Sequence, residues 1–331
     1  MIMPHHYINQ SQLKVSLLER VKYFFAATKC LILAQFLDRT RRLDMMCQFI
    51  NGNKNGDLHH KYHFVETLRE LGYRVPEQHL YDNKVSSDLS PILEFQSQQG
   101  IVFCKPLEGS KGVGVYTAPN GEALKEFIGN KKEDYIVQEF LPPVKDCRYL
   151  YHVGPEKIFR ACYEKCKPIV IGDGKTTLDD LIKKEASIPA SSRKKIRANH
   201  KRKLKRCPAE GEVTALVASG NISQGAYGII LNDEEHEAID AVILPLIKDL
   251  DEKRGIKMTT YCFDIGLLRE VSGATPFTKN DLVFYEFQMP FDMNGYFRAS
   301  DLTAVRKETQ KMLVTSYIRE WTDRPREVAS S

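Results

Sequence analysis

Apolar residues in the first part of the chain recur at helical spacing. Between about residues 11 and 50 they return every three or four positions, which predicts helix. A further helix is predicted from an N-cap at Asp57 to Leu71, because Gly72 stands just beyond the last apolar position. Another helix is predicted near the C-terminus.

Short runs rich in β-branched and aromatic residues predict strands over the rest of the chain. Helices are predicted between them at 122–128, 178–186 and 233–254, and the last of these ends at Gly255. Since strands and helices mix with few strand–helix–strand units, the pattern predicts an α+β fold. The predicted extended segments are 73–81, 101–104, 113–117, 135–141, 146–154, 157–164, 167–175, 212–218, 259–267 and 282–290.

The stretch CKPLEGSKGVGVY, from Cys104 to Tyr116, is a glycine-rich connection between two predicted strands. A P-loop would need Lys and then Ser or Thr after its last glycine, and a dinucleotide fingerprint would need a third glycine opening a helix. Neither motif fits, so a hairpin is predicted. Its backbone N–H groups could lie over phosphates, with Lys105 adding a point charge. The alternative is an ordinary surface turn with solvated lysines.

The composition is that of a globular protein, because 42% of the 331 residues are hydrophobic and 27% are charged. The net charge of +5 is small for this length and does not by itself indicate nucleic acid. The eight cysteines lack metal-ligand spacing, which favours free thiols in a reducing compartment over a zinc site. The N-terminus lacks the regions of a signal peptide, so a cytoplasmic location without membrane attachment is expected.

Two predicted strands near the C-terminus carry polar residues among apolar ones. Period-two geometry predicts that Glu286 and Gln288 share one strand face. Leu282 and Phe284 are predicted on that same face. Asp264 is an acid in an otherwise apolar strand, where an unpaired charge is costly. If the strands are neighbours, the three polar side chains offer oxygen ligands suited to Mg²⁺ or Mn²⁺. The alternative is a salt bridge from Glu286 to an arginine.

Further polar groups lie earlier in the chain. Asp146 and Arg148 share a strand face, where an acid suits a ribose and a guanidinium suits phosphate or carboxylate. A cross-strand ion pair on a solvated surface is an equal alternative. Nine Lys or Arg residues lie between 193 and 206. This basic run predicts either a solvated helix face or a surface that docks an anionic substrate. Since no aromatics are interleaved, nucleic acid is the less favoured partner.

The order of these segments resembles that of the ATP-grasp carboxylate–amine ligases. The nearest resemblance is to the branch of ribosomal-protein glutamate ligases, cyanophycin synthetase and the glutathione-synthetase part of bifunctional glutathione enzymes. It covers roughly residues 58–300. The segments that carry it are LRELGYRVPE (68–77), KPLEGSKGVGV (105–115), YIVQEFL (135–141), KDCRYLYHVG (145–154), IVIGDGKTTLDDLI (169–182), PAEGEVTALVASGNISQG (208–225), FDIGL (263–267) and YEFQMP (285–290).

The resemblance implies an ATP-grasp fold, in which two α+β subdomains grip the nucleotide after a short, mainly helical N-terminal segment. The implied parts are a helical segment at 1–57, a first subdomain with the glycine hairpin at 58–141, a second subdomain with the metal site at 142–310, and a C-terminal helix and tail at 311–331.

The resemblance also implies residue roles around ATP and a metal ion. Those that would bind the nucleotide are Lys105, Gly109, Ser110, Lys111, Gly112 and Gly114 at the phosphates, Gln138, Glu139 and Leu141 at the adenine, and Asp146 at the ribose. Those that would face the acyl phosphate as catalytic residues are Arg148 and Asn221. Those that would ligate Mg²⁺ or Mn²⁺ are Asp264, Glu286 and Gln288. Lys61 stands near the position of a second phosphate-contacting lysine.

The implied activity is ATP-dependent formation of an amide or peptide-like bond through an acyl phosphate. The partners would be small-molecule or peptide carboxylates and amines, acidic ones included, and a homo-oligomer stays open. Gln288 departs from the asparagine usual in the family. A non-catalytic nucleotide-binding protein of the same fold is therefore an alternative, and a nucleic-acid-binding protein is a third.

Overall fold

The computed structural model describes residues 58, 60–83, 88–108, 114–129, 131–153, 158–217, 220, 224–272 and 275–288. The helices predicted at 11–50 and near the C-terminus lie outside these ranges. In the ranges given, no helix is both long enough and apolar enough to cross a membrane.

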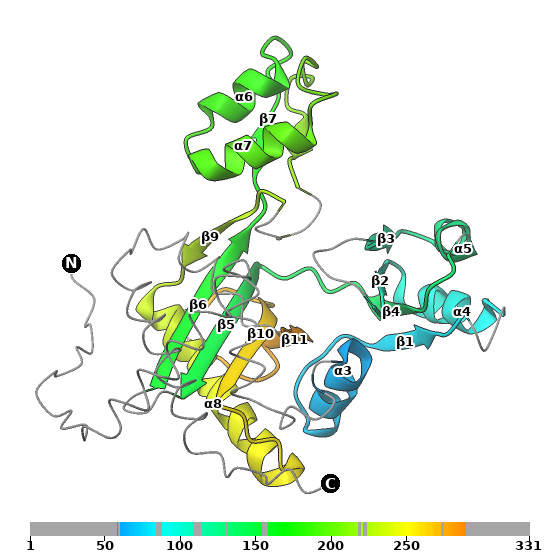
Figure 1. The fold of residues 1–331 in the computed structure, drawn as a ribbon, viewed down its shortest axis with the longest axis vertical. Helices are drawn as coiled ribbons and strands as arrows, with labels where there is room; N and C mark the ends of the chain where they lie inside the picture. The colour runs from blue at the N-terminus through cyan, green and yellow to red at the C-terminus, as the bar shows by residue number, and fades with distance from the viewer. Residues whose placement is uncertain are drawn as a thin grey trace, which may run out of the picture.

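A four-stranded antiparallel sheet with helices on one face forms the first unit (Figure 1). Its elements are β1 (Gln78–Tyr81), α4 (Ser90–Gln99), β2 (Val102–Pro106), β3 (Tyr116–Ala118), α5 (Gly121–Gly129) and β4 (Tyr135–Glu139). The strand order is β1-β4-β2-β3. Cys104 and Val137 point into a core shared with Leu124 of α5. Because side chains alternate along a strand, Lys105 lies on the opposite face.

A five-stranded antiparallel sheet of order β11-β10-β5-β6-β9 forms the second unit. Its elements are β5 (Lys145–Val153), β6 (Ile158–Cys166), β9 (Tyr227–Ile230), α8 (Asp233–Arg254), β10 (Thr260–Leu267) and β11 (Leu282–Phe287). Ile239 and Ile243 of α8 pack on one face of the sheet. Helix α3 (Lys61–Glu70) precedes β1 in the sequence, but its Phe64 and Leu68 lie in this second core.

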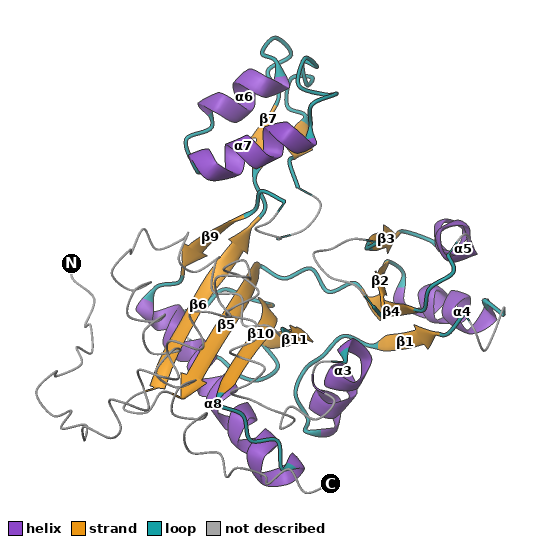
Figure 2. Cartoon of the chain, viewed as in Figure 1, coloured by secondary structure: helices purple, strands orange, loops and turns teal. Residues whose placement is uncertain are grey.

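A smaller unit, residues 167–226, stands apart from the large sheet at the top of Figure 1; we refer to it as the outer module. Figure 2 shows that it combines two helices with a short antiparallel sheet of two strands. Its elements are β7 (Ile169–Ile171), α6 (Leu178–Lys184), α7 (Ala190–Asn199) and β8 (Val213–Ala215). Val170, Ile182 and Ile196 form the centre of its own small core.

The elements in the described ranges confirm the predicted α+β class. Helix α8 spans the predicted residues because its ends are well defined. Asn232 and Glu235 form a capping box at its start, and Gly255 adopts the left-handed conformation (φ 64°) after its end. Pro245 lies inside this helix, as predicted.

The structure differs from the predicted elements at three places. Helix α3 begins at Lys61 with His60 as its N-cap, not at Asp57, which lies outside the described residues. Helix α4 occupies a segment where no helix is predicted, although Pro91 near its start and Gly100 after its end are helix boundary signals. Strand β9 (Tyr227–Ile230) occupies a segment where no strand is predicted.

Candidate active site

An irregularity in strand β11 decides where Glu286 points. Ile265 of β10 pairs with Phe284, and the next residue, Asp264, pairs with Glu286, so Tyr285 has no partner in the ladder. Such a bulge moves every side chain beyond it to the other face of the sheet. Phe284 faces the core under α8. Glu286 therefore lies beside Asp264 on the face away from α8.

The bulge corrects one sequence prediction. Leu282 and Phe284 were expected to share a face with Glu286 and Gln288, but both lie in the core together with Phe287, on the opposite side. A strict period of two cannot anticipate this, because the extra residue resets the alternation. The condition set for the three polar side chains is met for two of them, because the strands of Asp264 and Glu286 are neighbours.

Arg148 of β5 holds Asp264 from the other side. Its Nε donates to Asp264 Oδ1 at 2.8 Å and its Nη2 donates to Oδ2 at 3.0 Å. Burial alone would raise the pKa of Asp264, but the charges of Arg148 and Lys165 outweigh it and hold the pKa at about 2. The cross-strand ion pair considered for Arg148 thus exists, but with Asp264, and both side chains are nearly buried at 12% and 11% exposed. A fork of this kind fixes both carboxylate oxygens.

Lys165 of β6 joins this cluster, although no sequence motif points to it. Its ammonium lies 2.8 Å from an oxygen of Asp146 and 3.3 Å from one of Asp264. Burial lowers the pKa of an amine, but the two carboxylates prevail and raise the pKa of Lys165 above its usual value. A signal exists in the sequence. Lys165 shares a strand face with Ala161 and Tyr163, where a charge needs a partner.

Lys105, on β2 of the four-stranded sheet, contacts the strand that carries Glu286. Its ammonium donates to the carbonyl oxygen of Tyr285, the neighbour of Glu286, at 3.3 Å. The residue is 7% exposed. Burial lowers the pKa of Lys105 to about 8, against the attraction of Glu286, and the nearby Lys61 lowers it further. Lys61 itself donates to the Pro106 carbonyl at 3.0 Å. A buried amine with a perturbed pKa beside carboxylates is typical of functional sites.

The residues predicted at the adenine lie on and just after β4. The Gln138 amide is buried and donates to Gln78 at 3.1 Å, while Glu139 accepts a backbone N–H at 3.2 Å. The Leu141 carbonyl accepts from the Tyr285 hydroxyl at 2.8 Å. Tyr285 therefore links the segment after β4 to the bulge and, through its own carbonyl, to Lys105 of β2.

Of residues 109–114 in the predicted phosphate loop, only Gly114 lies in the described part of the structure. Its φ is 78°, and a Cβ there would meet Pro106 and Tyr135 at 3.3 Å, so this turn requires glycine. The predicted residues that lie outside the described ranges are Gly109, Ser110, Lys111, Gly112 and Asn221.

The carboxylate pair has the donor chemistry that a hard divalent cation requires. Asp264 and Glu286 face each other across the ladder with oxygen ligands. Gln288 is close, but its amide nitrogen donates to Asp264 Oδ2 at 3.3 Å, so its oxygen would reach a metal only after the amide turns over. Among the described residues, no three His, Cys, Asp or Glu side chains form a cluster that could hold a metal ion. Two carboxylates and an amide are nevertheless the kinds of oxygen donor that Mg²⁺ or Mn²⁺ binds.

Gly266 keeps Tyr285 in its position. A Cβ at Gly266 would lie 2.5 Å from the Tyr285 hydroxyl and 2.7 Å from Pro143. Gly266→Ala is therefore expected to displace the ring and to lower the free energy of unfolding by about 1–3 kcal/mol, as overpacking does. Chemical denaturation measures this change. Gly129→Ala, at a position with no atom within 4 Å, is the matched control and should shift stability by less than about 0.5 kcal/mol. Equal stability of the two variants would contradict the assigned packing.

No family model matches the chain. A curated glutathione synthetase of Agrobacterium fabrum is 36% identical over 66 residues, which cover 18% of this chain and 21% of that protein. The match thus spans about a fifth of the relative's length.

Solved structures similar to the chain are ATP-grasp ligases, the class that the sequence motifs resemble. A bifunctional glutathione synthetase of Pasteurella multocida has a TM-score of 0.40 at 16% identity, covering 73% of this chain and 34% of that one. A D-Ala:D-Ser ligase of Enterococcus faecalis has a TM-score of 0.47 at 10% identity, covering 80% and 62%. An ATP-grasp ligase complexed with its minimal precursor has a TM-score of 0.42 at 10% identity, covering 82% and 63%. Likenesses this distant identify neither a substrate nor an activity.

Proposed function

We propose that the protein is an ATP-dependent ligase that joins a carboxylate to an amine and requires a divalent metal ion. The observation that carries the proposal is the meeting of Lys105, from the four-stranded sheet, with the strand that presents Glu286 beside Asp264 in the five-stranded sheet. A cation and a pair of carboxylates at the junction of two sheets suit a nucleotide phosphate chain and its metal.

The proposed roles follow from the charge of each group. Lys105 would bind the phosphates of ATP, and the glycine hairpin that follows it would cover them. Asp264, Glu286 and Gln288 would hold Mg²⁺ or Mn²⁺, which when bound would neutralise charge on the phosphoryl group. Arg148 would orient the phosphoryl oxygens, because a guanidinium suits phosphate and this one lies beside Asp264 in the proposed metal site.

The proposed reaction has two steps. A carboxylate oxygen of the acid attacks the γ-phosphorus, the bond from that phosphorus to the bridging oxygen breaks, and ADP leaves. The amine nitrogen then attacks the acyl carbon, inorganic phosphate leaves, and the nitrogen loses a proton to give the amide. Asn221 is proposed to face the acyl phosphate with Arg148. The two predicted subdomains, 58–141 and 142–310, would enclose the nucleotide and keep water from the intermediate.

The direct test is a screen for ADP release with pairs of amino acids and small peptides, in the presence of Mg²⁺ and ATP. We expect one class of acid to stimulate ADP release. With hydroxylamine in place of the amine, that acid should yield a hydroxamate, which reports the acyl phosphate. Calorimetry measures binding of Mg-ATP to the protein. If Mg-ATP does not bind, the proposed function is wrong, because the reaction requires it.

A second function is favoured by one feature of the site. Both oxygens of Asp264 accept hydrogen bonds from Arg148, and Lys165 and Gln288 also contact this carboxylate. A protein that binds nucleotide without catalysis could use these internal partners in place of a metal. Binding of ATP that is unaffected by Mg²⁺ removal, together with no ADP release for any acid, would favour this second function.

A further inference from the structure

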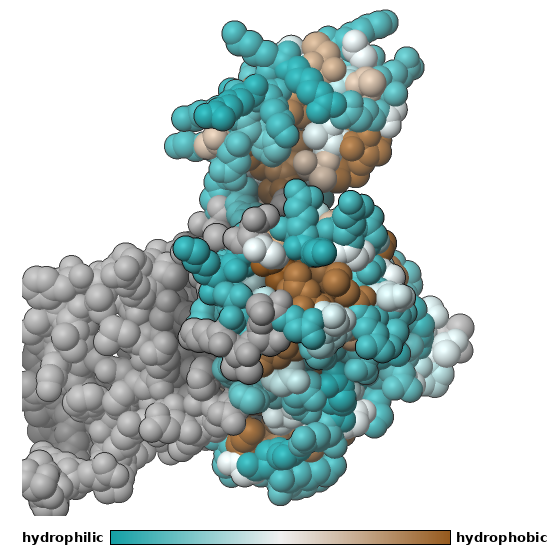
Figure 3. All heavy atoms as spheres, turned by 90° about the vertical axis from the view of Figure 1, so that its right-hand side faces the viewer, coloured by the Kyte–Doolittle hydropathy of each residue, from teal (hydrophilic) through white to brown (hydrophobic). Residues whose placement is uncertain are grey.

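The outer module carries a positive charge that the rest of the chain does not share. Residues 167–226 contain thirteen Lys or Arg and six Asp or Glu, a net charge of +7, whereas the whole chain carries +5. The remaining residues therefore have a small net negative charge. Figure 3 shows the module as the upper lobe, with a surface that is mostly hydrophilic.

Some of these cations have structural roles inside the module. Arg197 pairs with Asp179 on α6, and Arg206 pairs with Glu212. Arg193 donates to two backbone carbonyls, at 2.7 and 3.0 Å. These side chains connect the elements of the module, so part of their charge is already compensated within it.

Four other cations lie together in the turn that follows α7: Lys201, Arg202, Lys203 and Lys205. We call them the cationic turn. All four are exposed, and no ion pair or hydrogen bond of their side chains is found among the described residues. Of the acids in the same module, Asp179, Asp180 and Glu212 are already paired with other cations.

The backbone of the cationic turn is held in place from several sides. The Lys203 N–H donates to the His200 carbonyl at 2.7 Å, and the His200 ring contacts the Leu216 carbonyl at 2.8 Å. The Asp179 N–H donates to the Leu204 carbonyl at 3.0 Å. The charges are thus carried by a fixed scaffold, which reduces the entropy lost when a partner binds.

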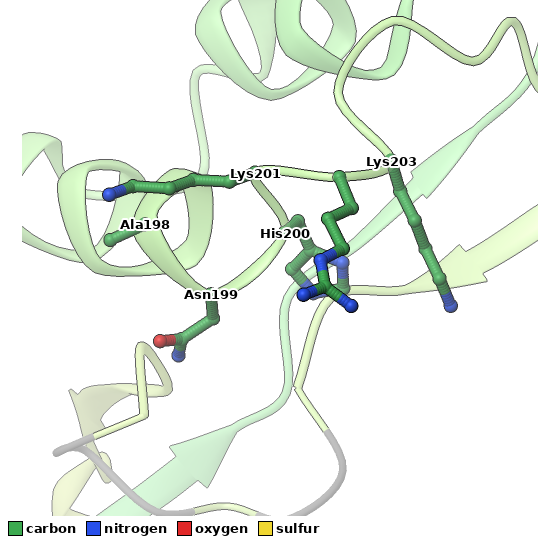
Figure 4. A pocket seen from close by; sticks show the side chains of 6 residues that line it. Ala198, Asn199, His200, Lys201 and Lys203 are labelled. Atoms are coloured by element: carbon green, nitrogen blue, oxygen red, sulfur yellow. The ribbon is translucent and has the colours of Figure 1, made fainter.

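The turn also borders a hollow of about 500 Å³, lined by residues 198–203. In Figure 4, Lys201 extends back beside the end of α7, whereas Lys203 points away from it. His200 lies between them and turns toward the body of the module. The ammonium groups are therefore spread along the rim, an arrangement that suits an extended anion with several charges more than a single small ion.

The chemistry of the module favours carboxylates on a polypeptide over nucleic acid. Residues 167–226 contain no Phe, Tyr or Trp, so the module offers no aromatic surface on which bases could stack. Carboxylates are also the groups on which the proposed ligase would act. Clustered exposed cations raise the rate at which such an anion is captured.

We propose that the cationic turn docks an acidic polypeptide segment of the substrate. That this segment belongs to a substrate rests on the proposed ligase function. Binding of the segment itself requires neither ATP nor catalysis. A failure of docking and a failure of ligation can therefore be told apart.

The test measures fluorescence anisotropy of a fluorescein-labelled oligo-glutamate with the full chain, without ATP. Lys201→Gln, Arg202→Gln and Lys203→Gln are combined in one variant. The control variant combines three substitutions at exposed lysines outside the module: Lys125→Gln, Lys132→Gln and Lys248→Gln. It loses the same amount of positive charge as the first variant. At about 0.01 M ionic strength we expect the first variant to bind about tenfold more weakly than the wild type, and the control to differ by less than about twofold.

Three outcomes would overturn the proposal. Equal loss in the two variants would mean that only the total charge matters. Tighter binding of a duplex or single-stranded oligonucleotide of similar charge, lost in the first variant, would assign the turn to nucleic acid. Tighter binding of phosphatidylserine vesicles, lost in the same way, would assign it to a lipid surface.

Discussion

Glu286→Gln is expected to reduce ATP-dependent ligation by about a thousandfold, with ADP release and hydroxamate formation as the measurements. The change keeps the size of the side chain and removes its charge. Loss of one preorganised electrostatic contact to a transferring group costs about two to three powers of ten. Because the bulge at Tyr285 places Glu286 next to Asp264, the lost charge would come from the proposed metal site.

Two further variants separate chemistry from folding. Glu164→Gln makes the same change in the same sheet and is the control. Glu164 pairs with Cys147, which faces the core on the α8 side, so Glu164 points away from the site. The turnover of this variant should stay within about twofold of wild type. Gln288→Asn should retain measurable turnover, because an amide oxygen of either length is an acceptable ligand. Turnover by Glu286→Gln within tenfold of wild type would remove this carboxylate from the mechanism.

The regular parts of the fold could be predicted because their signals are local. Helix α8 has a capping box, an acidic first turn, a basic last turn and a terminal glycine, all within its own sequence. Helix α4 has weaker local signals: Pro91 and Gly100 mark its ends, but its N-cap Leu89 makes no side-chain hydrogen bond and only two of its residues are buried. The position of α3 in the second core depends on contacts with β10 and β11, which no local pattern encodes.

Three charged residues of the cluster could be predicted from the sequence, but Lys165 and the pairings between the charges could not. Asp264, Glu286 and Arg148 stand out as charges in apolar strands, and each lies in the cluster. Arg148 was considered with Asp146, yet it pairs with Asp264, because sheet register rather than sequence distance decides which charges meet. Asp146 instead pairs with Lys165. The bulge that aims Glu286 depends on the fit of Tyr285 over Gly266, a tertiary contact.

Lys105→Met is expected to weaken Mg-ATP binding by about 2 kcal/mol, or roughly thirtyfold in Kd, as measured by calorimetry. The ammonium is buried beside Tyr285 and attracted by Glu286, where a phosphate would gain a charged partner. Lys125→Met, at an exposed lysine of α5, is the control and should bind as the wild type does. Equal ATP affinity of Lys105→Met and wild type would count against the phosphate role.

The same variant should be more stable than the wild type at pH 7. The pKa of Lys105 is about 8 in the folded chain, below the usual value of 10.5, because burial disfavours the ammonium. A group with a depressed amine pKa costs stability below pH 8, and the cost disappears as pH rises toward 10.5. Lys105→Met removes that cost, so its gain in Tm should be largest below pH 8 and should vanish near pH 10.5. If Lys105→Met raises Tm and weakens ATP binding, the charge of Lys105 serves function at the expense of stability. A fall in Tm at pH 7 would instead show that the ammonium stabilises the fold, through Glu286 and the Tyr285 carbonyl.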